Sequence, residues 1–292
     1  ELFLSRAKYV WHNGKFDVKF FRHNNIPARC DEDTMLMSYT LNEKRGVHEL
    51  DQVDLDKLGI KPHKDMLEAY LPRKDSSFAL VPRPVLYRYA AIDIDKTHRL
   101  KETLRPQIEA DTNCSKLYNN LLIPAQKFLT KVEERGLRVD VAWATATEEF
   151  LVKECERHEQ PIRDASQKLR GRDINVRSHI QLKEFLWKDL RLGPVGMSTD
   201  EDHLKWAIDR VGAHPVLVDL MRHREVFTQY KTFNIPLLHK GQTKDDGHVH
   251  STYLLHGTPT GRLASREPNL QNIPRGPIIP GQYIARNGIV FF

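Results

Sequence analysis

The sequence predicts three successive parts: an α/β first third, a mostly helical middle and an end that contains strands. In the first third, a strand-like stretch at residues 9–11 leads through a turn into an apolar helix that starts near Asn13. The middle repeats apolar positions at helical spacing, with capping residues between the repeats. The end combines a turn at residues 245–247 with an alternating stretch typical of a strand.

Composition sets broad limits on the kind of protein. A chain of 292 residues can bury a substantial core and has room for two domains. The formal charge of +6 and the pI of about 9.1 mildly favour an acidic partner such as nucleic acid. The three cysteines are widely spaced and form no metal or disulfide pattern, which favours a reducing compartment. No apolar run approaches the ~18 residues of a membrane span, and no signal-peptide pattern is visible.

In the first third, Asn13 is a candidate cap for the helix that follows it. Asp17 lies four residues later, on the same face of the first helical turn. A carboxylate there can point out of the carboxyl end of a sheet, where α/β proteins place ligands. The alternative is structural, since an acid in the first turn also stabilises the helix N-terminus.

A second carboxylate lies near the end of this part. Tyr89 and Asp93 are four residues apart, so on a helix their side chains share a face. A phenol beside a carboxylate is suited to orient a metal-bound water, and phosphodiester cleavage with two metals needs several carboxylates. Alternatively, Tyr89 is a core residue with its hydroxyl at the rim, and Asp95 is a solvated helix charge.

The middle reads as a helical module. Leu121 and Phe128 belong to an apolar stripe at helical spacing, predicted to be mostly core, and Gly136 ends it in a cap position. Asp140 is expected to cap the next long helix, which should kink or break at Pro161.

Ser178 and Gln181 form a capping box at the start of a further helix. The free amides and positive dipole end of such a start can hold a phosphate. A purely structural capping role for Ser178 is equally expected.

Two histidines alternate on the predicted strand at residues 248–254. His248 and His250 face one side of it and resemble a metal pair. Two histidines alone are weak evidence for a metal, so polar residues on an edge strand are the preferred interpretation.

The most distinctive segment is the run at residues 260–274, here called the amide-rich loop. From Thr260 to the end the chain has four Arg and one Glu. Asn269, Gln271 and Asn272 add amides that both donate and accept hydrogen bonds. Arg and amide side chains suit phosphate oxygens and the acceptors of the minor groove. The alternative is a polar surface loop stabilised by its own turns.

The complete pattern of this loop, T-G-R-L-x-S-x-x-P-N-L-Q-N-I-P, resembles the signature of family-A DNA polymerases, where the thumb enters the palm. Patterns farther upstream resemble the thumb of that family: E-x-x-G-x-x-V-D at residues 133–140 and N-x-x-S-x-x-Q-L at 175–182. Others resemble its 3′–5′ proofreading exonuclease domain: N-x-x-F-D at 13–17, D-T-M-L-x-x-Y-x-L at 33–41, H-x-L at 48–50 and Y-x-x-x-D at 89–93.

The resemblance implies an internal piece of such a polymerase. Residues 1–105 would be an incomplete α/β ribonuclease-H-like exonuclease domain, 106–238 a mostly helical thumb, and 239–292 the first strands of an α+β palm. The first exonuclease motif would precede Glu1. The strand at residues 289–292 would lead toward a palm catalytic aspartate that lies beyond the end.

The resemblance also implies roles for single residues. Asp93 would be a direct metal ligand, Asp17 would act largely through metal-bound water, and Tyr89 would orient the attacking water. Mg²⁺ or Mn²⁺ would serve in two-metal sites of the parent protein. Arg262 would lie in the minor groove at the primer terminus, and an ordinary surface role remains open for Arg222. The residues expected to bind DNA are Asn13, Asn175, Ser178, Arg222, Thr260, Arg262, Asn269, Gln271 and Asn272.

The function implied is DNA-directed DNA synthesis with a proofreading exonuclease, in a cytoplasmic, monomeric enzyme without a membrane partner. The expected partners are primer–template DNA, the 3′ end of single-stranded DNA and dNTPs, while the chain alone is expected to be inactive. Two alternatives stay open: a stand-alone DEDD-type 3′–5′ exonuclease, and a non-catalytic DNA-binding module.

Overall fold

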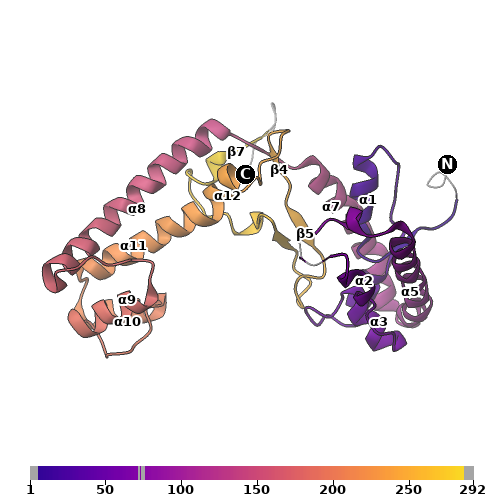
Figure 1. Cartoon of the computed structure of the whole chain (residues 1–292), viewed down its shortest axis with the longest axis horizontal. Coiled ribbons are helices and arrows are strands. Elements are labelled where there is room, and N and C mark those ends of the chain that lie inside the picture. The colour runs from indigo at the N-terminus through magenta and orange to yellow at the C-terminus, as the bar shows by residue number, and fades with distance from the viewer. Residues whose placement is uncertain (1–5, 72, 74–75, 286–292) are drawn as a thin grey trace. The chain divides into compact units, whose positions relative to one another are not determined.

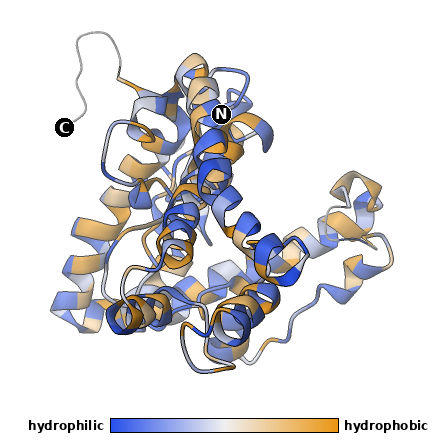
Figure 2. Ribbon diagram, turned by 90° about the vertical axis from the view of Figure 1, so that its left-hand side faces the viewer, coloured by the Kyte–Doolittle hydropathy of each residue, from blue (hydrophilic) through white to orange (hydrophobic). Residues whose placement is uncertain are grey.

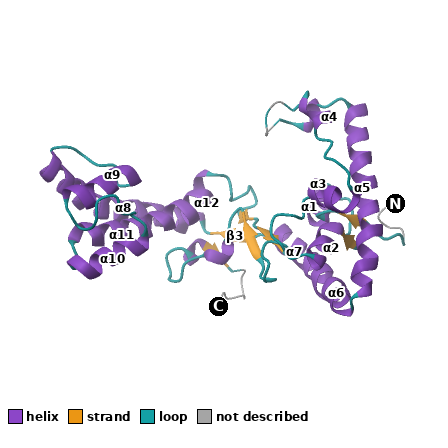
Figure 3. Ribbon diagram, turned by 90° about the horizontal axis from the view of Figure 1, so that it is seen from below, coloured by secondary structure: helices purple, strands orange, loops and turns teal. Residues whose placement is uncertain are grey.

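The computed structural model describes residues 6–71, 73 and 76–285 (Figures 1 and 3). It is mostly helical and divides into two compact units, each built from two stretches of chain. The first unit comprises residues 1–136 and 251–271, and the second comprises 137–250 and 272–292. The strand expected at residues 289–292 lies outside the described residues. The domain boundaries at 105/106 and 238/239 stay a prediction.

The first unit packs helices around two small two-stranded sheets, a parallel pair β1–β2 and an antiparallel pair β5–β6. Its strands are β1 (Val10–Trp11), β2 (Glu32–Asp33), β5 (Thr252–Leu254) and β6 (Ala264–Arg266). Its helices are α1 (Gly14–His23), α2 (Thr34–Leu41), α3 (Leu50–Leu58), α4 (Asp65–Glu68), α5 (Arg83–Ala110), α6 (Thr112–Lys116) and α7 (Ile123–Arg135). Short 3₁₀ turns at Phe78–Leu80 and Leu270–Asn272 and a π-helical turn at Leu117–Leu122 complete the elements that start in it.

The core of this unit lies between α2 and α5. Leu100, Leu104 and Ile108 recur at four-residue spacing on α5 and are fully buried. Six consecutive residues of α2, from Thr34 to Tyr39, are buried as well. A helix with apolar residues on every side has to be enclosed, which explains why α2 lies in the centre of the unit.

Helix α7 buries only part of the predicted apolar stripe: Leu129 of that stripe is 6% exposed, as predicted, but other members are not buried. Leu121, just before it, and Phe128 on it are 59% and 66% exposed, so their assignment to the core is wrong. Gln126, Thr130 and Glu133 lie on the buried side instead. Polar groups can occupy a core when partners satisfy them. The partners of Gln126 and Glu133 come from segments far away in sequence, while Thr130 donates to a carbonyl of its own helix.

The second unit pairs two long helices, α8 (Val141–Arg170) and α11 (Pro215–Gln229), which run side by side (Figure 1). Its other helices are α9 (His179–Glu184), α10 (Glu201–Val211) and α12 (Ile235–His239), with π-helical turns at Phe185–Asp189 and Tyr230–Asn234 and a 3₁₀ turn at Pro280–Gln282. Its sheet has the order β4 (His248–Val249), β3 (Leu137–Val139), β7 (Tyr283–Ile284), with both pairs antiparallel.

The apolar sides of these helices meet in one cluster that includes Phe185, Trp187 and Leu217, each at most 1% exposed. The polar residues lie on the same helices, so hydrophilic and hydrophobic positions alternate along the ribbon (Figure 2). Within the described residues, no helix combines the length and the hydropathy that a bilayer crossing requires.

Several predicted helix ends are confirmed. Asp140 accepts a hydrogen bond from the Trp143 amide at the start of α8, and Gly136 is the C-cap of α7 with φ 66°. Ser178 accepts from the Gln181 amide at the start of α9. Helix α8 does not end at Pro161 but continues to Arg170.

The single strand expected at residues 248–254 is two strands in different sheets. β4 pairs with β3, and β5 pairs with β6. Between them, the buried Ser251 hydroxyl donates to the carbonyl oxygens of Arg266 and Pro268. His248 and His250 both contact Asp246, so their polar groups have partners close by in the turn.

Candidate functional site

The amide-rich loop is carried by the β5–β6 hairpin. Leu254 pairs with Ala264, and the chain between them presents Thr260 and Arg262 as exposed residues. Gly261 has φ 73°, a left-handed conformation that favours glycine and lets the chain turn just before Arg262. Within the part of the chain that the structure describes, the Arg262 guanidinium has no hydrogen-bond or ion-pair partner, so the cation faces solvent from a folded hairpin.

The three amides of this loop differ in their surroundings. The Asn269 side-chain oxygen accepts from the Ser265 hydroxyl at 3.0 Å and from the Gln271 amide at 3.1 Å. Asn269 therefore stabilises the turn, as the alternative interpretation expects. Gln271 and Asn272 are exposed on the 3₁₀ turn that follows.

The predicted carboxylate Asp17 lies on α1 and is half-buried. Burial raises its pKa to about 6, and the negative charge of Asp33 adds to this shift. Asn13 precedes the helix with φ 58°, and its side chain makes no capping hydrogen bond. The expectation that Asn13 caps the helix through its side chain is therefore wrong.

Asp33 supplies the missing cap. Its buried carboxylate accepts from the backbone amides of Asn13 and Gly14, at 3.1 and 2.8 Å. It also caps its own helix α2 through Met35 and Leu36, and accepts from the Gln126 amide nitrogen at 2.5 Å. Sequence reasoning named Asp33 only as part of a pattern. The available signal was an acid directly before a helix-forming run.

Tyr89 and Asp93 share a face of α5, as their spacing predicts, and the phenol hydrogen-bonds the carboxylate. Burial raises the pKa of Asp93 and raises that of Tyr89 to about 12. His63 completes the cluster: its Nε2 lies 3.4 Å from the Asp93 carboxylate, and its ring stacks on Tyr89 with centroids 4.7 Å apart.

A buried lysine lies next to this cluster. Lys96 is 1% exposed, and its ammonium lies 2.9 Å from His63 Nδ1 and 3.3 Å from the Asp54 carboxylate. The charges of His63 and Lys96 are the strongest influences that favour the ionised form of Asp93. His63 and Lys96 thus lie beside this carboxylate, and the Lys96 ammonium also pairs with the neighbouring acids Asp51 and Asp54.

The two predicted metal ligands have separate surroundings. Asp33 is the charge that acts on Asp17, whereas His63, Lys96 and Asp51 act on Asp93. Among the described residues, no group of three His, Cys, Asp or Glu side chains could hold a metal ion. These residues therefore do not fit the cage that Mg²⁺ or Mn²⁺ needs, and a two-metal reaction has no complete site among them.

In the second unit, the predicted contact residues Asn175 and Ser178 lie at the start of α9. The Asn175 side-chain oxygen accepts a hydrogen bond from the Arg177 backbone amide. The Asn175 backbone amide donates to the side-chain oxygen of Gln181. In a regular capping box the Gln181 side chain would accept from the backbone amide of the N-cap residue Ser178, whereas here it accepts from the backbone amide of Asn175. Arg222 is exposed on α11 and pairs with Glu225 at 3.0 Å.

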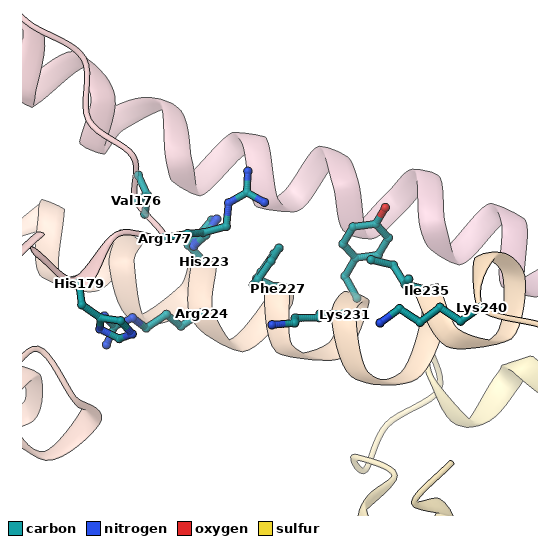
Figure 4. A pocket seen from close by; sticks show the side chains of 10 residues that line it. Val176, Arg177, His179, His223, Arg224, Phe227, Lys231, Ile235 and Lys240 are labelled. Atoms are coloured by element: carbon teal, nitrogen blue, oxygen red, sulfur yellow. The ribbon is translucent and has the colours of Figure 1, made fainter. Parts of the chain in front are cut away.

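Next to Asn175 and Ser178 lies an open pocket of about 730 Å³ that the sequence did not predict, here called the basic pocket (Figure 4). Its cations come from the 176–179 segment, from α11 and from the chain after it. The residues that line it are Val176, Arg177, His179, His223, Arg224, Phe227, Tyr230, Lys231, Ile235 and Lys240.

None of the described residues that line this pocket is acidic, although Glu159 approaches the buried His223 ring to 3.3 Å from outside the lining. The Arg177 guanidinium lies 5.2 Å from the centre of the Phe227 ring, and Arg224 donates to the Thr199 carbonyl. His223 is 2% exposed, and burial lowers its pKa, so its ring is neutral at pH 7. Its Nδ1 has no hydrogen-bond partner among the described residues. The pocket therefore offers two held guanidiniums and two ammoniums, which together suit an anion, whereas the neutral His223 ring directs its Nε2 to Glu159.

Comparison with known proteins agrees with the mostly helical fold and with the loop pattern. Residues 145–287 match the model of DNA polymerase family A. DNA polymerase I of Treponema pallidum is 31% identical over 276 residues, which cover 91% of this chain and 26% of that protein. The DNA polymerase of Escherichia phage T5 is 28% identical, with 96% and 36% covered.

A solved structure, the POL domain of Pol1 from M. smegmatis in complex with DNA primer-template and dNTP, matches with a TM-score of 0.72. The identity is 25%, and the match covers 96% of this chain and 46% of that one. The chain thus spans about a quarter to a third of the two curated relatives named above. Residues 145–287 thus carry the features of DNA polymerase family A, and the chain is similar to polymerases over more than nine-tenths of its length.

Proposed function

We propose that this chain is the part of a DNA-directed DNA polymerase that holds the primer–template duplex. The observation that carries the proposal is the exposed guanidinium of Arg262 on the amide-rich loop of the β5–β6 hairpin, which has no partner among the residues that the structure describes. Every base pair presents acceptors in the minor groove, so a fork of Arg donors can grip a duplex of any sequence there. Gln271 and Asn272 lie exposed on the same segment and add amide donors.

The basic pocket of the second unit is the proposed contact with the phosphate backbone. Arg177, Lys231 and Lys240 supply cations without a neighbouring acid in the lining. Such contacts fix a protein on a duplex without reading its sequence. Asn175 and Ser178 are sequence neighbours of the lining residues Val176, Arg177 and His179, and they are proposed to contact the same backbone. Arg222, with its own acidic partner, is the weakest of the proposed contacts.

We assign residues 1–105 to a ribonuclease-H-like exonuclease part, 106–238 to a thumb and 239–292 to the start of a palm. The pairing of Tyr89 with Asp93 on one helix face supports the first assignment. The full-length protein is proposed to be a cytoplasmic monomer that uses divalent metals, dNTPs and DNA 3′ ends. Because the carboxylates of the described residues form no complete cage, this chain itself is proposed to hold DNA without cleaving it.

A second candidate function, a non-catalytic DNA-binding module, draws on the same incomplete set of carboxylates. His63 lies beside Asp93, Lys96 lies beside His63, and among the described residues no group of three His, Cys, Asp or Glu side chains could hold a metal ion. The two proposals differ in what a longer version of the protein would do. Added palm residues would restore nucleotide incorporation in the first, and would leave DNA binding alone in the second.

The test is a fluorescence-anisotropy titration of labelled primer–template with the 292-residue chain at fixed salt. Arg262→Ala should raise Kd about five- to a hundredfold, the range for a charged bidentate contact. Arg99→Ala, which removes the same charge from an exposed i,i+4 pair on α5, is the control and should leave Kd unchanged. An unchanged Kd for Arg262→Ala would overturn the proposed minor-groove role.

A further inference from the structure

The hairpin that carries Arg262 is fixed on its outer edge by a buried ion pair. The Tyr253 amide of β5 donates to the Glu133 carboxylate of α7 at 2.6 Å. The Lys15 ammonium of α1 donates to the Tyr253 carbonyl and lies 2.5 Å from the same carboxylate. A strand edge normally pairs with another strand, and here two side chains satisfy it instead.

A second set of hydrogen bonds leads from the core to the loop itself. The Tyr39 hydroxyl of α2 donates to the Thr258 carbonyl at 2.8 Å. The Thr258 hydroxyl in turn donates to the Arg262 carbonyl at 2.7 Å. Tyr39 is 6% exposed and sits on the most enclosed helix of the unit, so the first donor in this series is rigid.

The chain between these bonds has little freedom to move. A Cβ placed on Gly257 would lie 2.7 Å from the Cβ of Ala264, so the two sides of the hairpin are in close contact there. Leu255 packs against the core cluster that contains Tyr39, and the His256 ring lies edge-on to that of His48, with centroids 6.3 Å apart. In Figure 1 the chain that follows β5 accordingly runs beside α2.

We propose that Tyr39 is a positioning residue for Arg262, so that the exonuclease-like core holds the duplex-binding loop in place through Thr258. The inference rests on the proposed function of Arg262 and adds a role for a helix remote from the polymerase chemistry. The Tyr39 hydroxyl never touches DNA. It fixes one end of the turn at residues 258–262, which keeps the Arg262 donors aimed at one position and lowers the entropy lost on binding.

The test is a double-mutant cycle on the complete 292-residue chain, with Kd for primer–template measured by anisotropy. Tyr39→Phe removes only the hydroxyl and should raise Kd about three- to tenfold, the effect of one hydrogen bond. In the Arg262→Ala background the same change should have no further effect, because the residue through which it acts is gone. Thr258→Val, which removes the second donor from a half-buried site, should reproduce both results if Tyr39→Phe fails to fold.

A matched control separates positioning from general loss of stability. Tyr118→Phe also removes a buried phenol of the first unit, one that accepts from the Asp33 amide at 2.8 Å and does not contact the loop. It should lower the melting temperature without changing Kd. If Tyr39→Phe and Arg262→Ala have additive effects on Kd, or if Tyr118→Phe raises Kd equally, the positioning role is wrong while the role of Arg262 stands. If Arg262→Ala itself leaves Kd unchanged, both proposals are overturned.

Discussion

The amide-rich loop and the carboxylates Asp17 and Asp93 lie in the same unit of the molecule, yet the loop forms a complete structural element and the carboxylates form no complete metal site among the described residues. Arg262 extends from a hairpin whose backbone is satisfied by Glu133, Lys15 and Tyr39. Asp17 and Asp93 have separate electrostatic neighbours and gather no third acidic ligand among the described residues. A DNA contact can be built from one folded hairpin, whereas a metal cage needs acids from several elements to converge.

Removing the support of the hairpin is expected to have the largest effect. Glu133→Ala leaves the ammonium of Lys15 buried without its partner and should lower the free energy of unfolding by about 3–5 kcal/mol. Denaturant titration of the chain measures this loss. The neighbouring Glu134→Ala breaks only the exposed pair with Arg22 and should cost at most about 1 kcal/mol. Equal losses for the two variants would mean that Glu133 does not stabilise the hairpin.

Acid should weaken the same region through His256. Burial lowers its pKa in the folded chain to about 4, below the ordinary histidine value of 6.5. Between these values the unfolded chain binds more protons, so stability is retained above pH 6.5 and lost as the pH falls toward 4. Compared with the His256→Gln variant, the wild-type chain should lose on the order of 2 kcal/mol of its free energy of unfolding across this pH window. The other groups titrate equally in the wild-type chain and in the variant. Parallel profiles of stability against pH would therefore contradict the assignment of this loss to His256.

The basic pocket provides a milder test of DNA holding. Lys231→Ala combined with Lys240→Ala should lower the slope of log Kd against log salt by about 1.8, the value for two phosphate contacts. Lys188→Ala combined with Lys205→Ala removes the same charge from exposed lysines of the second unit that pair with Glu184 and Glu201. A smaller change in slope is expected for this control. Identical slopes for the two double variants would mean that the pocket has no special role.

The smallest expected effect concerns metal. Millimolar Mg²⁺ should leave the melting temperature of this chain unchanged, because binding that stabilises a fold requires a site in the folded state. Differential scanning fluorimetry with and without EDTA measures it. A saturable rise in melting temperature that disappears in Asp93→Asn would show that the carboxylates do gather around a cation.

Local features of the fold could be predicted from the sequence, and long-range ones could not. The caps at Asp140 and Ser178 and the pairing of Tyr89 with Asp93 depend on neighbours within four residues. The side chain of Asn13 does not cap α1 because Asp33, twenty residues away, takes that place. The same cause explains α7: Gln126 is buried because Asp33 accepts its hydrogen bond, a partner that helical periodicity cannot reveal.

The candidate site divides in the same way. The amide-rich loop is one continuous segment, so its composition and turns already indicated a polar binding surface. The basic pocket combines Arg177 with Lys231 and Lys240, which lie more than fifty residues farther along the chain. Only the packing of the 176–179 segment against α11 brings them together, and nothing in the local pattern of either segment signals the other.

The central claim is that this chain holds a duplex without completing metal chemistry. The most direct measurement follows binding and turnover of one labelled primer–template in the same sample, with Mg²⁺ and dNTPs present. The account predicts saturable, salt-sensitive binding that Arg262→Ala weakens, with the primer neither extended nor shortened. Absence of binding at low salt, or a primer that is shortened or extended by the purified chain, would contradict it.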